Sequence, residues 1–293
     1  MNPHRAILIA GPTAAGKSAL ALALAQRHDG IVINADSMQV YRDLRILTAR
    51  PSQCDIEAVP HALYGYVPGD AAFSAGRWLA DAILALEDAW RRGKVPIVVG
   101  GTGLYFKALL EGLSPIPEVP AAIRSHWRDE AQRIGAQALH DLLAVRDPPT
   151  AARLRPTDTQ RLTRALEVVV ATGRGLSDWH NEAGRPVLSE AVTLRHVVAP
   201  HRSVLQARAD ARFDAMIAAG AIDEVRRLAA LGLPRDVPVM RALGVPPLLA
   251  AIEGRGRLAD AITRAKLDTR QYIKRQDTWL RRNMMSWNWN FEQ

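Results

Sequence analysis

Cysteine is almost missing from this chain of 293 residues, which contains only Cys54. A lone thiol excludes an internal disulfide and a zinc site built from cysteines. Long apolar runs are missing as well. The longest, residues 19–25, is far too short to span a bilayer, and the N-terminus has no secretion-signal pattern. These absences predict a cytoplasmic protein with no disulfides and no membrane contact.

Acidic residues are outnumbered by basic ones. The chain has 38 Lys and Arg against 30 Asp and Glu, a net charge of +8, which favours a polyanionic partner. Between residues 255 and 282, nine basic residues accompany three Asp and are interleaved with Tyr272 and Trp279. This pattern suits a nucleic-acid backbone with a stacked base. A buried tryptophan on a helix with a basic outer face would give the same pattern.

A phosphate-binding loop is the clearest feature that is present. Residues 6–10 are an apolar run, residues 11–18 read Gly-Pro-Thr-Ala-Ala-Gly-Lys-Ser, and an Ala- and Leu-rich run follows. This order of strand, loop and helix fits the G-x-x-x-x-G-K-S pattern, whose backbone N–H groups hold phosphate oxygens. Lys17 adds a point charge and Ser18 a hydroxyl for Mg²⁺. The predicted diphosphate-binding residues are Gly11, Pro12, Thr13, Ala14, Ala15, Gly16, Lys17 and Ser18.

Two further predicted strands end in residues that suit a ligand site. Residues 31–35 run into Asp36, and residues 95–99 run into Gly100 after an amphipathic helix over residues 73–92. Because the carboxyl ends of parallel strands share one edge of a sheet, we expect Asp36 and Gly100 beside the phosphate loop. An Asx turn or a helix cap is the structural alternative for Asp36.

The sequence between residues 114 and 196 differs in character from the rest. It begins with a proline-rich joint and shows helical patterns, and a strand over residues 194–200 then returns to the sheet. We predict an α/β fold with a P-loop nucleoside-triphosphatase-like parallel sheet core, residues 1–113 and 197–293, and an inserted helical domain, residues 114–196.

Two predicted helices outside the phosphate loop carry clustered polar groups. Gln160, Arg161 and Arg164 share one helix face in the insertion, which is either a binding surface or a solvated face. In a later helix, Arg208 and Arg212 stand four residues apart, a fork that suits phosphate or carboxylate. A last long helix is expected over residues 258–282.

Five motifs in order resemble those of the tRNA dimethylallyltransferases, also called tRNA isopentenyltransferases. They are Gly-Pro-Thr-Ala-x-Gly-Lys-Ser at 11–18, Asp-Ser-x-Gln-x-Tyr at 36–41, Gly-Gly-Thr-x-x-Tyr at 100–105, Gln-Arg-x-x-Arg-Ala-Leu-Glu at 160–167 and Lys-Arg-Gln-x-Thr-Trp-x-Arg at 274–281. The first motif is generic to nucleotide-binding proteins, and the other four together are specific. They cover nearly the whole chain. One departure is that Val245-Pro246-Pro247 stands where the family commonly continues with Tyr.

The resemblance implies transfer of a dimethylallyl group from dimethylallyl diphosphate to N6 of the adenosine 3′-adjacent to the anticodon in tRNA, with release of diphosphate. It implies that Asp36 is the general base, that Thr102 orients the amine and that Arg212 contacts the diphosphate. Mg²⁺ on Ser18 is the implied metal. The implied contacts with the tRNA anticodon stem-loop are Asp36, Ser37, Met38, Gln39, Thr102, Arg124, Gln160, Arg161, Leu162, Thr163, Arg164, Arg241, Lys274, Arg275, Gln276, Thr278, Trp279 and Arg281.

Three other functions share part of this pattern. A P-loop small-molecule kinase has the same loop but does not explain the 160–167 and 274–281 motifs. A prenyltransferase that acts on free AMP does not require the insertion or the basic last helix. A non-catalytic RNA-binding NTPase does not explain Asp36 at the mouth of the site. We expect a monomer.

Overall fold

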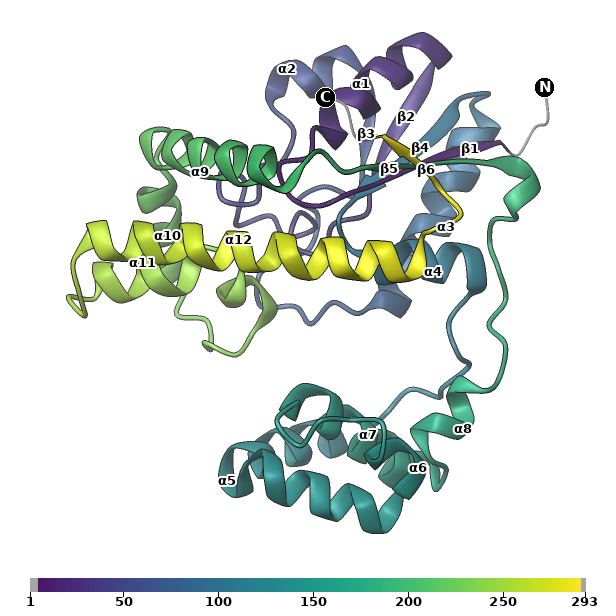
Figure 1. The fold of residues 1–293 in the computed structure, drawn as a ribbon, viewed down its shortest axis with the longest axis vertical. Helices are drawn as coiled ribbons and strands as arrows, with labels where there is room; N and C mark the ends of the chain where they lie inside the picture. The colour runs from purple at the N-terminus through teal and green to yellow at the C-terminus, as the bar shows by residue number, and fades with distance from the viewer. Residues whose placement is uncertain (1–4, 291–293) are drawn as a thin grey trace. The chain divides into compact units, whose positions relative to one another are not determined.

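The computed structural model describes residues 5–290, in which six parallel strands form one sheet of order β3-β2-β4-β1-β5-β6 (Figure 1). The strands are β1 (Ala6–Ala10), β2 (Gly30–Asn34), β3 (His61–Ala62), β4 (Val95–Gly100), β5 (Thr193–Val198) and β6 (Asn288–Asn290). The predicted parallel α/β core is confirmed. Within residues 5–290, no helix is both long enough and apolar enough to cross a membrane.

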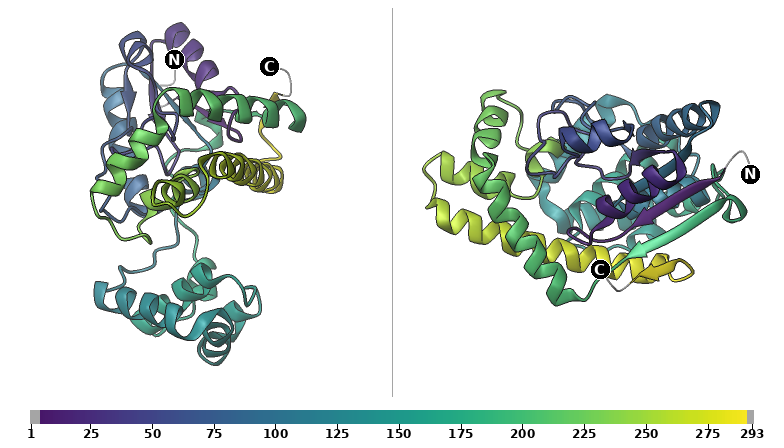
Figure 2. Two further views of the ribbon diagram at one scale, coloured as in Figure 1. Left: turned by 90° about the vertical axis from the view of Figure 1, so that its left-hand side faces the viewer. Right: turned by 90° about the horizontal axis from the view of Figure 1, so that it is seen from above.

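The helices of the core lie on both faces of this sheet (Figures 1 and 2). They are α1 (Lys17–His28), α2 (Gln53–Ala58), α3 (Ala75–Arg91), α4 (Gly103–Glu111), α9 (Arg202–Ala218), α10 (Ala221–Ala230), α11 (Val245–Ile252) and α12 (Leu258–Asn283), with short 3-10 turns at Glu190–Val192 and Pro238–Arg241. Alternate residues of a strand face opposite sides, so Leu8 packs in the cluster that holds Trp78 of α3, while Ile9 packs in the cluster that holds Ala25 and Leu205. Two apolar cores result, one on each face.

Helix α3 illustrates how the sequence sets an element. Ser74 caps it by accepting the N–H of Arg77 at 3.2 Å, and Trp78, Ala82 and Leu86 recur every four residues and are fully buried. A side chain that recurs at this spacing stays on one face of a helix. The predicted amphipathic helix over residues 73–92 is confirmed to within two residues.

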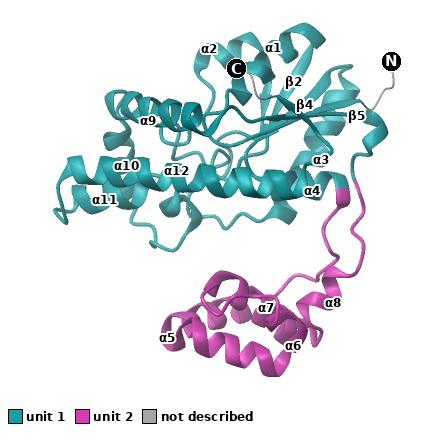
Figure 3. Cartoon of the chain, in the orientation of Figure 1, with its two compact units in different colours: residues 1–110, 187–293 teal, residues 111–186 magenta. Residues whose placement is uncertain are grey.

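Residues Glu111–Pro186 form a second compact unit, made of helices (Figure 3). These are α5 (Ala121–Arg146), α6 (Pro148–Ala151), α7 (Thr159–Thr172) and α8 (Leu176–His180). The compact unit ends at Pro186, ten residues before the boundary that the sequence predicts. The reason is that Val187 and Leu188 both donate their N–H groups to the carbonyl of Leu109, which joins them to the core.

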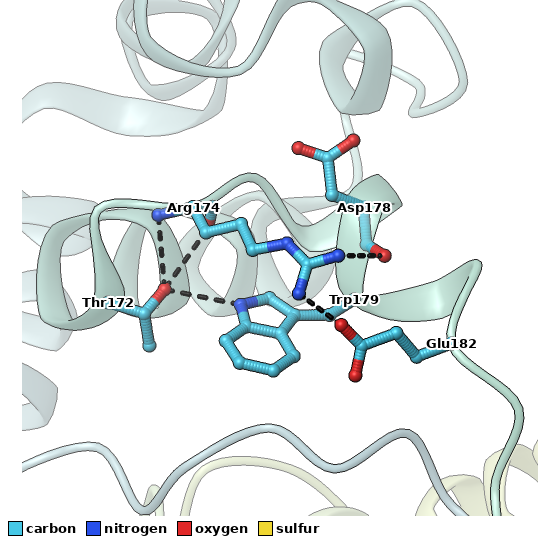
Figure 4. A network of polar contacts seen from close by, with 5 residues as sticks. All are labelled: Thr172, Arg174, Asp178, Trp179 and Glu182. Atoms are coloured by element: carbon cyan, nitrogen blue, oxygen red, sulfur yellow. Dashed lines mark hydrogen bonds and ion pairs between the residues drawn. The ribbon is translucent and has the colours of Figure 1, made fainter.

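The turn from α7 into α8 is held by a network of polar contacts (Figure 4). The guanidinium of Arg174 lies 4.5 Å from the ring centre of Trp179, donates to the carbonyl of Asp178 and pairs with Glu182. The indole N–H of Trp179 donates to Thr172 at 3.2 Å. The end of α7 is therefore fixed on α8 by side chains from both helices.

Strand β6 and helix α11 are among the elements that the sequence does not predict. Strand β6 adds Trp289 and its neighbours to the edge of the sheet beside β5, although its three residues are too few to show a strand pattern. The segment Val245-Pro246-Pro247, which departs from the family pattern, opens α11, where prolines are tolerated because the first turn needs no intrahelical N–H donor. Val245 is fully buried there.

Candidate active site

The phosphate loop joins β1 to α1 and has the backbone that its glycines allow. Gly16, which caps α1, has a φ of 94°, in the left-handed region that favours glycine. At Gly11, a Cβ atom would lie 2.4 Å from the carbonyl oxygen of Val198, so only glycine permits this approach of β1 to β5. The Lys17 ammonium donates to the carbonyl of Pro12 at 2.6 Å. The loop is therefore closed around its own lysine.

Lys17 shares its surroundings with one carboxylate and one guanidinium. Burial lowers the pKa of Lys17 to about 8, the carboxylate of Asp36 acts in the opposite direction, and the charge of Arg212 lowers it further. Burial also lowers the pKa of Arg212, which Asp36 again opposes. The three groups predicted to bind diphosphate and to take the proton are therefore electrostatic neighbours, brought together from α1, from the end of β2 and from α9.

Asp36 is held in a tight turn at the end of β2. Its N–H donates to Oδ1 of Asn34 at 2.9 Å, and its own Oδ1 accepts the N–H of Met38 at 2.9 Å. Asn34 is fully buried, and its amide donates to the carbonyls of Asp36 and Leu63. The Asx turn, considered above as an alternative to a functional role, is present. It orients the carboxylate and does not remove it from the cavity described below.

Thr102 follows β4 and is joined to the same turn. Its N–H donates to the carbonyl of Ala35 at 3.1 Å, and its hydroxyl accepts the N–H of Ser37 at 3.0 Å. A Cβ atom at Gly100 would lie 2.0 Å from the carbonyl oxygen of Ala35, so glycine allows the two strand ends to touch. The predicted convergence of the β1, β2 and β4 ends is confirmed.

A cavity of about 320 Å³ opens beside Asp36. It is lined by Thr13, Asp36, Ser37, Met38, Leu47, Thr48, Ala209, Arg212, Phe213, Met216, Arg241, Ala242, Leu243, Thr269, Tyr272 and Arg275. The lining of this cavity therefore combines arginines with apolar side chains. One wall is held by buried Glu224 of α10, whose carboxylate accepts the N–H groups of Arg45, Ile46 and Leu47 at 2.6 to 2.9 Å.

Three tyrosines are electrostatic neighbours of the same carboxylate. Burial raises the pKa values of Tyr64, Tyr105 and Tyr272, and the negative charge of Asp36 raises each of them further. Their hydroxyls therefore keep their protons and can donate hydrogen bonds. Sequence reasoning does not assign Tyr64, Tyr105 or Asn34 to the site. For Asn34 there is a signal, since an amide at the end of the apolar run Ile-Val-Ile needs a buried partner.

The predicted tRNA contacts on α12 divide between two faces of the helix. Lys274, Arg275 and Thr278 are exposed, as is Arg281, which pairs with Asp277 at 2.9 Å. Gln276 points inward instead, with 6% of its surface exposed. Trp279 is half-buried, and its ring packs beside Gly103.

In the insertion, the predicted tRNA contacts lie on or beside α7. Gln160, Arg161 and Arg164 are exposed, whereas Leu162 and Thr163 are buried, so their side chains face the core of the helical unit. Arg161 pairs with Asp158 at 3.4 Å and Arg164 with Glu167 at 3.3 Å. Arg124, at the start of α5, lies 3.7 Å from Glu118.

The donor set at the phosphate loop suits a magnesium ion that arrives with phosphate. Within residues 5–290, no cluster of three or more His, Cys, Asp or Glu side chains could hold a metal on its own. Ser18 is exposed in the first turn of α1. Mg²⁺ commonly takes few protein ligands and completes its shell with phosphate oxygens and water. One hydroxyl beside a diphosphate therefore fits it.

Comparison with solved structures identifies close relatives of this fold. The tRNA isopentenylpyrophosphate transferase of Bacillus halodurans aligns with a TM-score of 0.70 and 32% identity, over 98% of this chain and 90% of that one. A eukaryotic dimethylallyltransferase, solved in the course of acting on tRNA, aligns with a TM-score of 0.81 and 32% identity, over 94% of this chain and 69% of that one.

Comparison of sequences gives the same result. The tRNA dimethylallyltransferase of Azorhizobium caulinodans is 54% identical over 282 residues, 96% of this chain and 90% of the relative. The enzyme of that name from Nitrobacter hamburgensis is 53% identical over 284 residues, 97% of this chain and 90% of the relative. An isopentenyl transferase family model matches residues 4–64, and an IPP transferase family model matches residues 39–283. With most of its length matched by that second model, this chain belongs to the IPP transferase family.

Proposed function

We propose that this protein transfers a dimethylallyl group from dimethylallyl diphosphate to N6 of the adenosine 3′-adjacent to the anticodon in tRNA. The observation that carries the proposal is a cavity that Asp36, Arg212 and apolar side chains line together, with Lys17 as an electrostatic neighbour of both charged groups. A prenyl diphosphate has a charged head and an apolar tail, so it matches a lining that combines arginine with Met38 and Phe213.

The proposed chemistry is a displacement at carbon. The N6–C1 bond forms as the bond between C1 and the diphosphate oxygen breaks, and the leaving oxygen keeps the bonding electrons. An adenine amine is a weak nucleophile because its lone pair is delocalised into the ring, so it needs a base as the new bond forms. Asp36 is assigned this role. Since its Oδ1 accepts the N–H of Met38, Oδ2 is the oxygen that we assign to the N6 proton.

The leaving diphosphate needs positive charge where its own charge grows. Lys17, Arg212 and the N–H groups of the phosphate loop are assigned to it. Thr102 is assigned to orient the amine beside Asp36, because its hydroxyl already contacts the turn that holds that carboxylate. Mg²⁺ on Ser18, when bound, would supply further charge to the diphosphate oxygens.

The target base is stacked in an anticodon loop, so it must leave the stack to reach the cavity, at a cost of a few kcal/mol. Single-stranded loops permit this more easily than duplexes. We assign the exposed Gln160, Arg161 and Arg164 of the insertion, together with the half-buried Arg124, to the anticodon stem-loop. The exposed basic face of α12 is assigned to the RNA backbone.

The direct test supplies purified protein with Mg²⁺, radiolabelled dimethylallyl diphosphate and either bulk bacterial tRNA or AMP, followed by nucleoside analysis. We expect label on N6 of adenosine in tRNA alone. Label on AMP alone would retain the prenyl chemistry and refute the RNA acceptor. If neither acceptor is labelled, transfer from γ-labelled ATP to small molecules tests the kinase alternative.

Asp36→Asn keeps an oxygen that can accept the N–H of Met38 but cannot take a proton. We expect kcat to fall about 10²- to 10⁴-fold, the usual contribution of a general base. Single-turnover transfer and tRNA binding measured in parallel check this, and tRNA affinity should not change. Asp70→Asn, at an exposed carboxylate, is the matched control. A near wild-type transfer rate in Asp36→Asn would remove the general-base assignment.

The depressed pKa of Lys17 predicts a pH dependence. Below about pH 8 the free enzyme carries a charged Lys17, and above it this charge is lost, so attraction for the diphosphate weakens as pH rises. We expect kcat/KM for dimethylallyl diphosphate to fall through about pH 8, because this ratio reports groups of the free enzyme. In Lys17→Arg the charge persists and the fall should disappear. A wild-type profile without this fall would contradict the prediction.

The insertion provides a separate test of RNA binding. Arg164 is left in place because it pairs with Glu167, which is 7% exposed. The double variant Gln160→Ala/Arg161→Ala should bind an anticodon stem-loop about tenfold more weakly and show a smaller salt dependence, since it has lost one cation. Its diphosphate affinity should stay unchanged. Arg153→Ala, another exposed arginine of the insertion, is the control, and an equal loss in this control would contradict the assignment.

A further inference from the structure

Thr102 lies between two glycines, and α12 packs directly on both. A Cβ atom at Gly101 would lie 2.3 Å from Nε2 of Gln276, and one at Gly103 would lie 2.1 Å from the ring of Trp279. Neither glycine has a positive φ. Glycine is therefore required on each side of Thr102 because α12 approaches closely. The backbone conformation at these two positions would accept other residues.

Gln276 forms hydrogen bonds with two different loops of the site. Its Oε1 accepts the N–H of Thr13 in the phosphate loop at 2.8 Å, and its Nε2 donates to the carbonyl of Gly101 at 3.1 Å. The side chain is buried, so these bonds are made away from bulk water, where a lost partner is costly. The side-chain amide of Gln276 thus joins the phosphate loop to the loop that contains Thr102.

Gly101 is linked to Asp36, the assigned general base, by a short chain of hydrogen bonds. Thr102, the next residue, donates its N–H to Ala35 and accepts the N–H of Ser37. Asp36 lies between these two residues in the sequence. A shift of the Gly101 carbonyl therefore moves the turn that holds the Asp36 carboxylate. A shift of Thr13 moves the phosphate loop, residues 11–18, which we call the diphosphate cradle.

We propose that Gln276 is a positioning residue for the transfer reaction, which sets the distance between the diphosphate cradle and the Asp36 and Thr102 pair. This role rests on the proposed function. It differs from the tRNA contact that the sequence motif implies for Gln276, because it acts on the chemical step and leaves tRNA affinity alone. An in-line displacement depends on this distance, since a misplacement of about 1 Å can cost about 10²-fold in rate.

The test compares two substitutions with their combination. Gly101→Ala should lower kcat about tenfold or more, because its methyl group collides with Gln276 and displaces the loop. Gln276→Ala alone should lower kcat less. In Gly101→Ala/Gln276→Ala the colliding side chain is gone, and the next contact of the methyl group is the Gly11 carbonyl oxygen at 3.4 Å. We expect the double variant to be faster than Gly101→Ala.

Gln276→Met tests the hydrogen bonds at nearly constant volume. It should lower kcat for saturating substrates while the tRNA dissociation constant stays at its wild-type value. Gln271→Ala, at an exposed glutamine of α12, and Gly76→Ala, where the methyl group has room, are the matched controls. Melting temperatures of all variants separate a lower rate from unfolding.

Three results would overturn the positioning role. They are a wild-type kcat in Gln276→Met, a loss confined to tRNA affinity, and a double variant no faster than Gly101→Ala with all variants folded. Calorimetric titration with inorganic diphosphate covers the case in which the wild type itself transfers no label. A wild type that transfers no label refutes the proposed function. Weaker diphosphate binding by Gln276→Met would then still support the link from Gln276 to Thr13, and unchanged diphosphate binding would refute this link.

Discussion

The negative charge of Asp36 is the interaction on which the rest of the site depends. It opposes the lowering of the pKa values of Lys17 and Arg212 by burial, and therefore favours the charged form of both groups. Burial raises the pKa values of Tyr64, Tyr105 and Tyr272, and the same negative charge raises them further. A single carboxylate therefore lies beside the cations that we assign to the diphosphate, and the proposed reaction assigns the proton to the same group.

The order of strands in the sheet explains why Asp36 and the phosphate loop are neighbours. Strands β2, β4 and β1 are adjacent and parallel, so Asp36, Thr102 and the phosphate loop all follow carboxyl ends at one edge. The glycine at position 100 lets the ends of β4 and β2 touch, and Asn34 closes the turn with its buried amide. Backbone geometry thus fixes the relative positions of groups that come from distant parts of the sequence.

The sequence predicts these strand-end residues well because each lies in a short local pattern with a fixed place in a parallel sheet. It predicts the walls of the cavity poorly. Leu47, Phe213 and Met216 look like any apolar residues in the sequence. They reach the cavity of Asp36 only because α9 and the 45–48 loop, which Glu224 of α10 holds, line it together. Gln276 was expected on the RNA side because it lies within a basic motif. On a helix, adjacent positions point in different directions, and its amide faces inward.

Helix α12 carries exposed basic residues on one face and the buried Gln276 on another. Lys274, Arg275 and Thr278 are exposed on it, while Gln276 contacts Thr13 and Gly101 from its buried side. Buried residues recur along this helix of 26 residues from Ala261 to Leu280, so it packs on the core over most of its length. Under the proposed function, one helix would therefore contact RNA with its exposed face and hold the phosphate loop and the loop of Thr102 with its buried face.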